Sequence, residues 1–193
     1  MKILVIAPME RELVNFNAAL STFDKLKHSY KAVTCDVGKA FAAACTAVEL
    51  SKEKYDLVVL VGYAGASSSY HQGDFLCPSA ARYHDADCPA EIVPELTQEF
   101  KLIGKDDCLL LSGDAFMTGD KAEALFAKYG HNVMFDMEGC AICQIAQKHN
   151  TPVAVLKYIS DTMGKGAENL QSFMEFSHSH TDFRCFVSWL EAL

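Results

Sequence analysis

Arginine is scarce in this sequence, and no cluster of basic residues occurs anywhere in it. The 17 lysine and arginine residues include three arginines, which stand far apart at Arg11, Arg82 and Arg184, and 25 acidic residues give a formal net charge of −8. A protein that binds the backbone of a nucleic acid needs a basic face. The composition therefore argues against a nucleic acid polymer as a partner.

A long apolar run is also missing. The apolar segment Lys2–Ala7 is too short for a signal peptide and is followed at once by Pro8, and no segment approaches the length of a membrane span. Eight cysteines without a secretion signal are typical of the reducing cytosol. The sequence therefore predicts a cytoplasmic protein that has no membrane as a partner.

Metal and redox motifs are absent from the pattern as well. Cys140 and Cys143 form a C-x-x-C pair, but no second pair follows at zinc-site spacing, and the pair falls inside a predicted helix. Small buried helix residues explain the pair better than a reactive thiol, which needs an exposed helix start. His178 and His180 come with no third ligand and are interpreted as a solvated turn. We expect no metal and no cofactor.

What the sequence does contain is a well-marked β-α-β pattern at Val133–Asp161, around which the rest is organised. Val133–Asp136 is a short apolar run ending in a carboxylate, and a helix follows from Glu138 with an apolar stripe at helical spacing. Val153–Ser160 is apolar on both faces, which indicates a buried, parallel strand. The pattern predicts an α/β fold with acids at the carboxyl ends of two strands, the edge where open α/β sheets bind ligands.

The remaining pattern predicts one globular domain, residues 1–193, without repeats or linkers. A short irregular segment is expected at Cys88–Lys105, and a glycine-containing loop at Thr162–Ala167. The other expected elements are strands at Lys2–Ala7, Lys31–Asp36, Leu57–Val61, Asp74–Ala80 and Cys108–Ser112, and helices from Pro8, at Lys39–Lys52, Lys121–Tyr129, Leu170–Phe176 and Asp182–Leu193.

Acidic and aromatic residues stand just beyond the carboxyl ends of four predicted strands, at Glu12, Phe116 with Met117, Glu138 and Asp161. A single acid there means little, but a set at one edge of a sheet marks a candidate cleft. The segment from Gly62 to Ser67 is interpreted as a turn with enough glycine for the backbone to approach a ligand. It is neither G-x-G-x-x-G nor a P-loop, so it is a weak signal for a nucleotide.

Lys157 is the one charged residue inside an otherwise apolar strand. It shares a strand face with Val153, Val155 and Ile159 and should be buried. An unpaired buried ammonium group is costly, so we expect a carboxylate partner, Asp136 or Glu138, on the neighbouring strand. A purely structural ion pair is an equally good explanation at this point.

Paired carboxylates suit the hydrolysis of a glycosidic bond, because one acid donates a proton to the leaving group while another activates water. A purine base leaves a nucleoside easily only when a ring nitrogen is protonated. The ribose then carries oxocarbenium-like charge that a carboxylate can stabilise.

Six sequence blocks occur in the order that is typical of one family. They are Ala-Pro-Met-Glu-Arg-Glu ending at Glu12, Val-Gly-Lys at 37–39, Ala-Arg-Tyr-His-Asp-Ala-Asp at 81–87, Ser-Gly-Asp-Ala-Phe ending at Phe116, Asp-Met-Glu at 136–138, and Ile-Ser-Asp ending at Asp161. With Ser-Phe-Met-Glu-Phe at 172–176, the chain resembles the bacterial 5′-methylthioadenosine/S-adenosylhomocysteine nucleosidases of the nucleoside phosphorylase superfamily. The resemblance runs almost end to end.

This resemblance implies a three-layer α/β/α sandwich with a central mixed sheet, and it implies a homodimer. It also implies that the protein binds a small purine nucleoside. In the implied site, Glu12 activates water and Asp161 delivers a proton to purine N7. Glu138 holds the ribose hydroxyls, Phe116 stacks on the base and the Met117 backbone reads its edge. The residues expected to bind substrate are Tyr63, Ala64, Gly65, Phe116, Met117, Asp136, Met137, Glu138, Lys157 and Ser160.

The chain also departs from the family pattern. It is shorter, with one hairpin missing before Val33 and a longer segment missing after Asp87, a region that in the family helps to cover the partner's pocket for the 5′-substituent. Tyr63 replaces a serine, which would place a phenol near the ribose and the water. Lys157 stands where the family has arginine, and Asp136 replaces glutamate.

Two alternatives to a nucleosidase follow from these departures. A phosphate-dependent purine nucleoside phosphorylase would need an anion pocket, which three arginines supply poorly. A nucleoside-binding protein that kept the fold and lost turnover is the third reading, motivated by Tyr63 and the trimmed loops.

Overall fold

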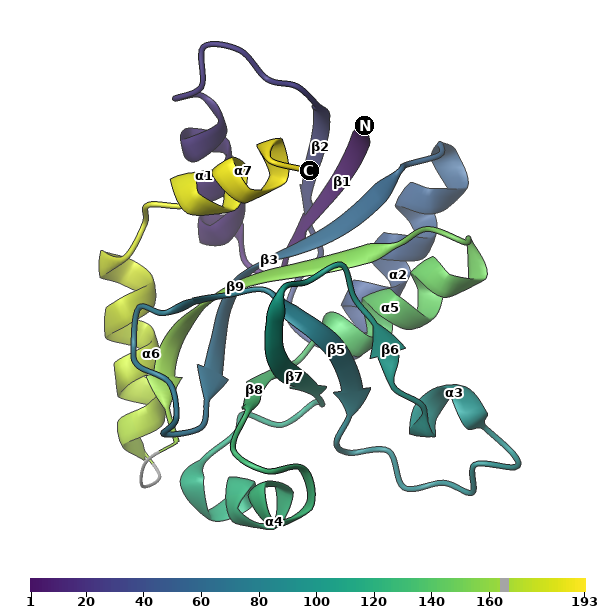
Figure 1. Cartoon of the computed structure of the whole chain (residues 1–193), viewed down its shortest axis with the longest axis vertical. Helices are drawn as coiled ribbons and strands as arrows, with labels where there is room; N and C mark the ends of the chain where they lie inside the picture. The colour runs from purple at the N-terminus through teal and green to yellow at the C-terminus, as the bar shows by residue number, and fades with distance from the viewer. Residues whose placement is uncertain (164–166) are drawn as a thin grey trace.

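The computed structural model describes residues 1–163 and 167–193, which fold into nine strands and seven helices (Figure 1). The strands are β1 (Lys2–Ala7), β2 (Ser29–Thr34), β3 (Leu57–Ala66), β4 (Phe75–Leu76), β5 (Pro78–Tyr83), β6 (Phe100–Lys101), β7 (Asp106–Ser112), β8 (Val133–Asp136) and β9 (Val153–Thr162). The helices are α1 (Glu10–Leu20), α2 (Lys39–Lys52), α3 (Pro94–Thr97), α4 (Gly119–Tyr129), α5 (Gly139–Lys148), α6 (Ala167–Ser179) and α7 (Arg184–Glu191).

All nine strands belong to a single mixed sheet. Seven of them follow the order β2-β1-β3-β8-β7-β5-β6, while β9 pairs with the other edge of β3 and with β4. Most pairs are parallel, but β3 with β8, β4 with β9, and β5 with β6 run antiparallel. The predicted α/β fold with a central mixed sheet is confirmed.

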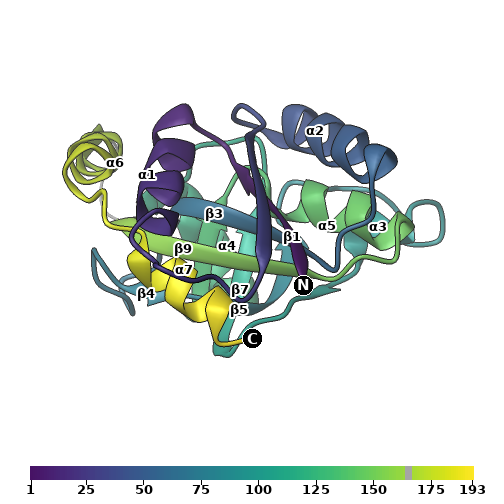
Figure 2. The ribbon, with the colours of Figure 1, turned by 90° about the horizontal axis from the view of Figure 1, so that it is seen from above.

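Helices cover both faces of the sheet (Figure 2). On one face, α1 and α7 bury Phe16, Phe186 and Leu190 against the side chains of β1 and β3 that point toward them. On the other face, α2 and α5 pack together and bury Ala42 and Ile142. The strands are apolar on both faces because both faces are covered, which is why β1 and β9 read as continuous apolar runs.

The direction of β8 differs from the expected β-α-β arrangement. Both β8 and β9 pair with β3, but β8 is antiparallel to it and β9 is parallel to it. The carboxyl ends of β8 and β9 therefore approach the segment Ala64–Ala66 of β3 from opposite directions. This brings Asp136 and Asp161 to the same place, although they do not lie at one edge of a parallel sheet.

The segment from Gly62 to Ser67, predicted to be a turn, is for the most part the second half of β3. It stays extended because β9 pairs with it along its length. The register shifts between Ala64 and Gly65, where β9 carries one extra residue, Ser160. Such bulges re-aim side chains next to functional sites, and this one precedes Asp161 directly.

Several predicted boundaries are wrong. The first helix begins at Glu10 rather than at Pro8, and α6 extends three residues past Phe176, so His178 belongs to a helix and not to a solvated turn. The predicted strand Asp74–Ala80 is two strands, β4 and β5, because the chain leaves β9 at Cys77 and joins β7. Segment 88–105 holds α3 and β6, and residues 164–166 of the predicted Thr162–Ala167 loop lie outside the described residues.

Candidate active site

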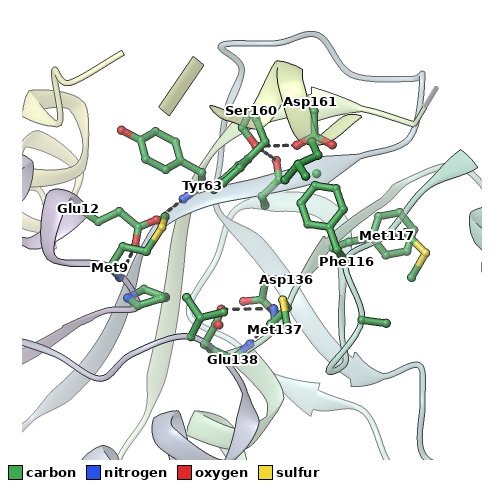
Figure 3. Close-up of a pocket in the computed structure, with 18 of the residues that line it drawn as sticks. Met9, Glu12, Tyr63, Phe116, Met117, Asp136, Met137, Glu138, Ser160 and Asp161 are labelled. Carbon is green, nitrogen blue, oxygen red and sulfur yellow. Dashed lines mark hydrogen bonds between the residues drawn. The ribbon is translucent and has the colours of Figure 1, made fainter. Parts of the chain in front are cut away.

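A pocket of about 180 Å³ opens where β3, β8 and β9 meet the loops before α1 and α4 (Figure 3). Its walls are mostly apolar, and of the residues that the structure describes, no lysine, arginine or histidine lines it. With the exception of Lys157, every residue that the sequence predicted for the site lines this pocket: Glu12, Tyr63, Ala64, Gly65, Phe116, Met117, Asp136, Met137, Glu138, Ser160 and Asp161.

Glu12 is held at the first turn of α1 with its carboxylate fully buried. The N–H of Met9 donates to Oε2 at 2.8 Å, and the N–H of Tyr63 donates to Oε1 at 3.0 Å. Gly62, at φ +145°, leaves the space for this carboxylate, since a Cβ there would lie 2.2 Å from Oε1. Burial raises the pKa of Glu12 to about 7, against the opposing charge of Lys157 and the two backbone donors. A carboxyl group with such a pKa can exchange a proton near neutral pH.

This raised pKa makes a prediction about stability. Because the folded pKa of about 7 exceeds the ordinary value of 4.5, folding favours the protonated form, and that stabilisation is lost as the pH rises from 4.5 through 7. Glu12→Gln stays neutral, so its free energy of unfolding relative to wild type should rise by up to about 3 kcal/mol between pH 4 and pH 8. Urea unfolding at both pH values measures this. Glu10→Gln, on the exposed side of the same turn, is the matched control, and an unchanged difference for Glu12→Gln would contradict the expectation.

Asp161 lies beyond the bulge in β9 and is 2% exposed. Its Oδ1 is 2.7 Å from Ser160 Oγ, and its Oδ2 accepts a hydrogen bond from Asn169 Nδ2 at 3.0 Å. Ser160 Oγ also lies 3.2 Å from the carbonyl of Ala64. The hydroxyl of Ser160 thus donates to Asp161 over the shorter of these two distances and helps to orient its carboxyl group. Burial raises the pKa of Asp161, against the hydrogen bonds from Ser160 and Asn169, which lower it.

Glu138 is the third carboxyl group in the pocket and comes from the turn between β8 and α5. Its Oε1 accepts the N–H of Gly38 at 2.8 Å, and its Oε2 accepts the N–H of Met137 at 3.2 Å. Gly38 belongs to the Val-Gly-Lys block, so this hydrogen bond explains the proximity of two sequence blocks a hundred residues apart. Burial raises the pKa of Glu138, and the neighbouring charge of Asp136 raises it further.

The carboxylate of Asp136 forms hydrogen bonds and an ion pair with neighbouring groups of the protein. It accepts hydrogen bonds from Ser112 Oγ at 2.6 Å and from the N–H of Gly139 at 3.1 Å, so it fixes the first turn of α5. Its Oδ2 lies 3.5 Å from Lys157 Nζ. Asp136 thus holds the turn that carries Glu138, and its edge lines the pocket wall.

Lys157 is 1% exposed and pairs with Asp136, one of its two expected partners. The expectation that this partner lies on the neighbouring strand is wrong, because β3 separates β9 from β8. Lys157 is opposite Gly62 in the register, so its side chain lies beneath the space that Glu12 occupies. It does not line the pocket, and it acts through the charges of Glu12 and Glu138, whose pKa values it lowers.

The phenol of Tyr63 does not point into the pocket, contrary to the sequence-based expectation (Figure 3). Its hydroxyl donates to the carbonyl of His180 at 2.7 Å and accepts from Asn15 Nδ2 at 3.2 Å, and its ring makes edge contacts with Phe176 and Phe183. The side chain belongs to the core beneath α1 and α7. The backbone of Tyr63 faces the site, so the phenol leaves the sugar and water positions free.

Apolar side chains form the rest of the pocket. Met117 and Met137 line it, and Phe116, which is 36% exposed, makes an edge contact with Phe173 of α6 at 6.1 Å between ring centroids. Sequence reasoning missed the remaining lining residues, although five of them lie in the recognised blocks. These lining residues are Pro8, Met9, Val37, Ala115, Phe135, Met163, Leu170 and Phe173.

The described residues show how the possible metal-ligating and thiol side chains are placed. They contain no group of three His, Cys, Asp or Glu side chains placed to hold a metal ion. Burial raises the pKa of the thiols of Cys140 and Cys143, as expected for packed helix residues. No described helix is long and apolar enough to cross a membrane.

Comparisons with known proteins agree with this geometry. The sequence profile of the phosphorylase superfamily matches residues 107–185. The 5′-methylthioadenosine/S-adenosylhomocysteine nucleosidase of Staphylococcus aureus (strain bovine RF122 / ET3-1) is 30% identical over 164 residues, which cover 72% of this chain and 72% of that protein. The nucleosidase of the same name from Bacillus licheniformis is 27% identical over 219 aligned positions, with 94% and 95% covered.

A solved structure extends the similarity to three dimensions. The Streptococcus pneumoniae MTA/SAH nucleosidase in complex with 8-aminoadenine has a TM-score of 0.83 and 25% identity, and the match covers 100% of both chains. The alignment with the Bacillus protein spans more positions than the 193 residues of this chain, which agrees with the expected shortening. The chain belongs to the 5′-methylthioadenosine/S-adenosylhomocysteine nucleosidase family of the phosphorylase superfamily.

Proposed function

We propose that this protein hydrolyses the N-glycosidic bond of an adenine nucleoside such as 5′-methylthioadenosine or S-adenosylhomocysteine. The observation that carries the proposal is the convergence of Glu12, Glu138 and Asp161, from three separate parts of the chain, on one apolar pocket. The names of the relatives support this reaction and this substrate class.

Each carboxyl group has a separate task in this reaction. Protonated Asp161 gives its proton to purine N7, which turns the base into a neutral leaving group as the bond between C1′ and N9 breaks. Ionised Glu12 takes a proton from the water that adds to C1′, and Glu138 accepts hydrogen bonds from the ribose hydroxyls. Water and nucleoside become free base and free sugar, and the proton gained by Glu12 returns to Asp161 through solvent.

The electrostatic surroundings suit this division of tasks. Three carboxyl groups line the cavity beside Asp136, while Lys157 is the buried cation that faces them. Four like charges in an apolar site cannot all be ionised at neutral pH. A protonated Asp161 with an ionisable Glu12 is the combination that an acid and a base on opposite sides of one bond require.

Hydrolysis and phosphorolysis are distinguished by one assay. Purified protein should release adenine from 5′-methylthioadenosine in phosphate-free buffer, and phosphate should not accelerate release. Chromatography of the free base and of the sugar product measures both. A strict requirement for phosphate would favour the phosphorylase reading, and adenine binding without any base release would favour the binding protein. The described pocket lining is mostly apolar and contains no cationic side chain that could bind phosphate.

The implied homodimer is part of the same proposal. Large apolar side chains at Val37, Phe41 and Val48 are 45% to 58% exposed along α2 and the turn before it. A second copy that covers such residues would remove them from water. A cytoplasmic location likewise stays a prediction from the sequence.

A further inference from the structure

Arg11 lies next to the pocket and has no acidic partner among the residues that the structure describes. Among the described residues, Arg184 forms an ion pair with Asp182 at 2.5 Å, whereas no carboxylate lies within 4 Å of the Arg11 guanidinium. Arg11 instead lies against two residues that line the pocket: its Nη2 is 3.4 Å from Met9 Sδ, and its guanidinium carbon is 5.7 Å from the centroid of the Phe173 ring. The positive charge of Arg11 thus lies next to the uncharged part of the pocket wall that Met9 and Phe173 form.

The guanidinium is oriented by α6 but its donors are not used up. Nη1 donates to Ser177 Oγ at 3.0 Å. His178 Nδ1 lies 3.2 Å from the same nitrogen, yet it is 2.6 Å from the carbonyl of Met174 and must carry the hydrogen of that bond. It therefore cannot accept from Arg11. With that tautomer, His178 Nε2 is an acceptor and lies 3.5 Å from Nη1. For the five N–H groups of Arg11, the contacts of the described residues therefore provide one oxygen acceptor, one weak sulfur acceptor and this long contact to nitrogen.

The place of Arg11 relative to the substrate follows from the proposed function, on which this inference rests. With the base beside Phe116 and Asp161 and the ribose hydroxyls on Glu138, the wall formed by Met9 and Phe173 is left for the 5′-substituent. A short alkylthio group would end against this apolar wall. A longer thioether chain that ends in an amino acid would pass it and reach the guanidinium.

We propose that Arg11 binds the α-carboxylate of a 5′-(amino-carboxyalkyl)thio substituent, so that the protein favours S-adenosylhomocysteine-like nucleosides over 5′-methylthioadenosine. A carboxylate accepts two parallel N–H bonds from a guanidinium, and such charged hydrogen bonds are among the strongest available at a protein surface. The cation–π contact with Phe173 holds the Arg11 guanidinium against the wall of the pocket.

A free phosphate fits the same place poorly. For attack at C1′ it would have to lie by Glu12, where the carboxylates of Asp136 and Glu138 are close and a single guanidinium would have to offset a dianion. A monoanionic carboxylate at the outer end of the substrate avoids these charges. The chemistry of the site therefore favours a carboxylate on the 5′-substituent, rather than a free phosphate, as the anion that Arg11 binds.

The test compares kcat/KM for S-adenosylhomocysteine, 5′-methylthioadenosine and the decarboxylated analogue 5′-(3-aminopropylthio)adenosine. Arg11→Gln should lower the ratio of the first substrate to the second by about tenfold, chiefly through KM, and Arg11→Glu should lower it further. Arg11→Lys should retain part of the preference for S-adenosylhomocysteine. The decarboxylated analogue lacks the carboxylate, so its kcat/KM should show no such preference over that of 5′-methylthioadenosine. Arg184→Gln, which changes an arginine that does not line this pocket, is the control and should leave the ratio unchanged.

Each other outcome overturns the proposal and is distinguishable. An equal loss for all three nucleosides, with unchanged melting temperatures, would mean that Arg11 acts on Glu12 and not on the tail. A rate that inorganic phosphate raises in wild type but not in Arg11→Gln would assign the guanidinium to phosphate. If wild type hydrolyses none of the nucleosides, the proposed function itself fails, whereas hydrolysis with an unchanged ratio removes only the role of Arg11.

Discussion

Replacing Asp161 by asparagine is expected to lower kcat for adenine nucleosides by about 10²- to 10⁴-fold, the usual contribution of a general acid. Asparagine keeps the shape of the side chain and can still donate a hydrogen bond to purine N7, but it has no proton to transfer. Substrate affinity should therefore change much less than turnover. Steady-state kinetics of adenine release, with adenine binding measured by calorimetry, separates the two effects.

The leaving group offers a sharper measurement for Asp161. A 4-nitrophenyl glycoside of the same sugar releases an anion that needs no proton, so wild type and Asp161→Asn should cleave it at similar rates. The control Asp56→Asn makes the same chemical change before β3, where the carboxylate accepts the N–H of Lys2 at 2.7 Å. If Asp161→Asn loses as much activity on the nitrophenyl substrate as on the nucleoside, Asp161 is not the acid.

The sequence predicted the buried residues well wherever a local pattern reports burial. The apolar run of β9 with a single lysine indicated both the strand and a carboxylate partner, and the structure contains both in Lys157 and Asp136. The direction and neighbours of β8 could not be predicted, because they depend on β3 pairing with two strands in opposite senses. Strand order is a property of the whole chain, whereas hydrophobic period is a property of a few residues.

Tyr63 shows why a residue can be placed at the correct site and still be misread. The glycines on either side suggested a turn, in which a side chain could point in any direction. In a strand, successive side chains alternate between faces, and Gly62 leaves room for the carboxylate of Glu12 on one face of β3. The phenol of Tyr63 must therefore point to the opposite face.

The contacts of the polar block at Ala81–Asp87, which lies outside the pocket lining, were the least predictable from the sequence. On spacing alone, the two acids, arginine and histidine of this block indicate no more than an exposed strand end or turn. In the structure, Asp85 accepts the N–H of Asp114 at 2.9 Å and the ammonium of Lys39 at 2.7 Å. It therefore ties the loop that leads to Phe116 to the start of α2. No local pattern announces such a contact, because its partners lie dozens of residues away in both directions.

Glu12→Gln is expected to have an effect as large as that of Asp161→Asn, about 10²- to 10⁴-fold on kcat, but with a different dependence on the leaving group. The amide cannot take a proton from water, and this step is required whichever group departs. Turnover of the nucleoside and of the 4-nitrophenyl glycoside should therefore fall together. Measured side by side, the two variants assign the acid and the base independently.

The arrangement around Glu12 allows this test to be controlled closely. Glu10→Gln changes a neighbouring exposed carboxylate on the same helix turn and should leave kcat unchanged. Adenine binding to Glu12→Gln should persist, since the proposed reaction places the base against Phe116 and Asp161, two other residues of the pocket lining. If Glu12→Gln still turns over the nucleoside at the wild-type rate, Glu12 is not the base that activates the water. The buried carboxylate at the start of α1 would then have to be explained by its hydrogen bonds to Met9 and Tyr63 alone.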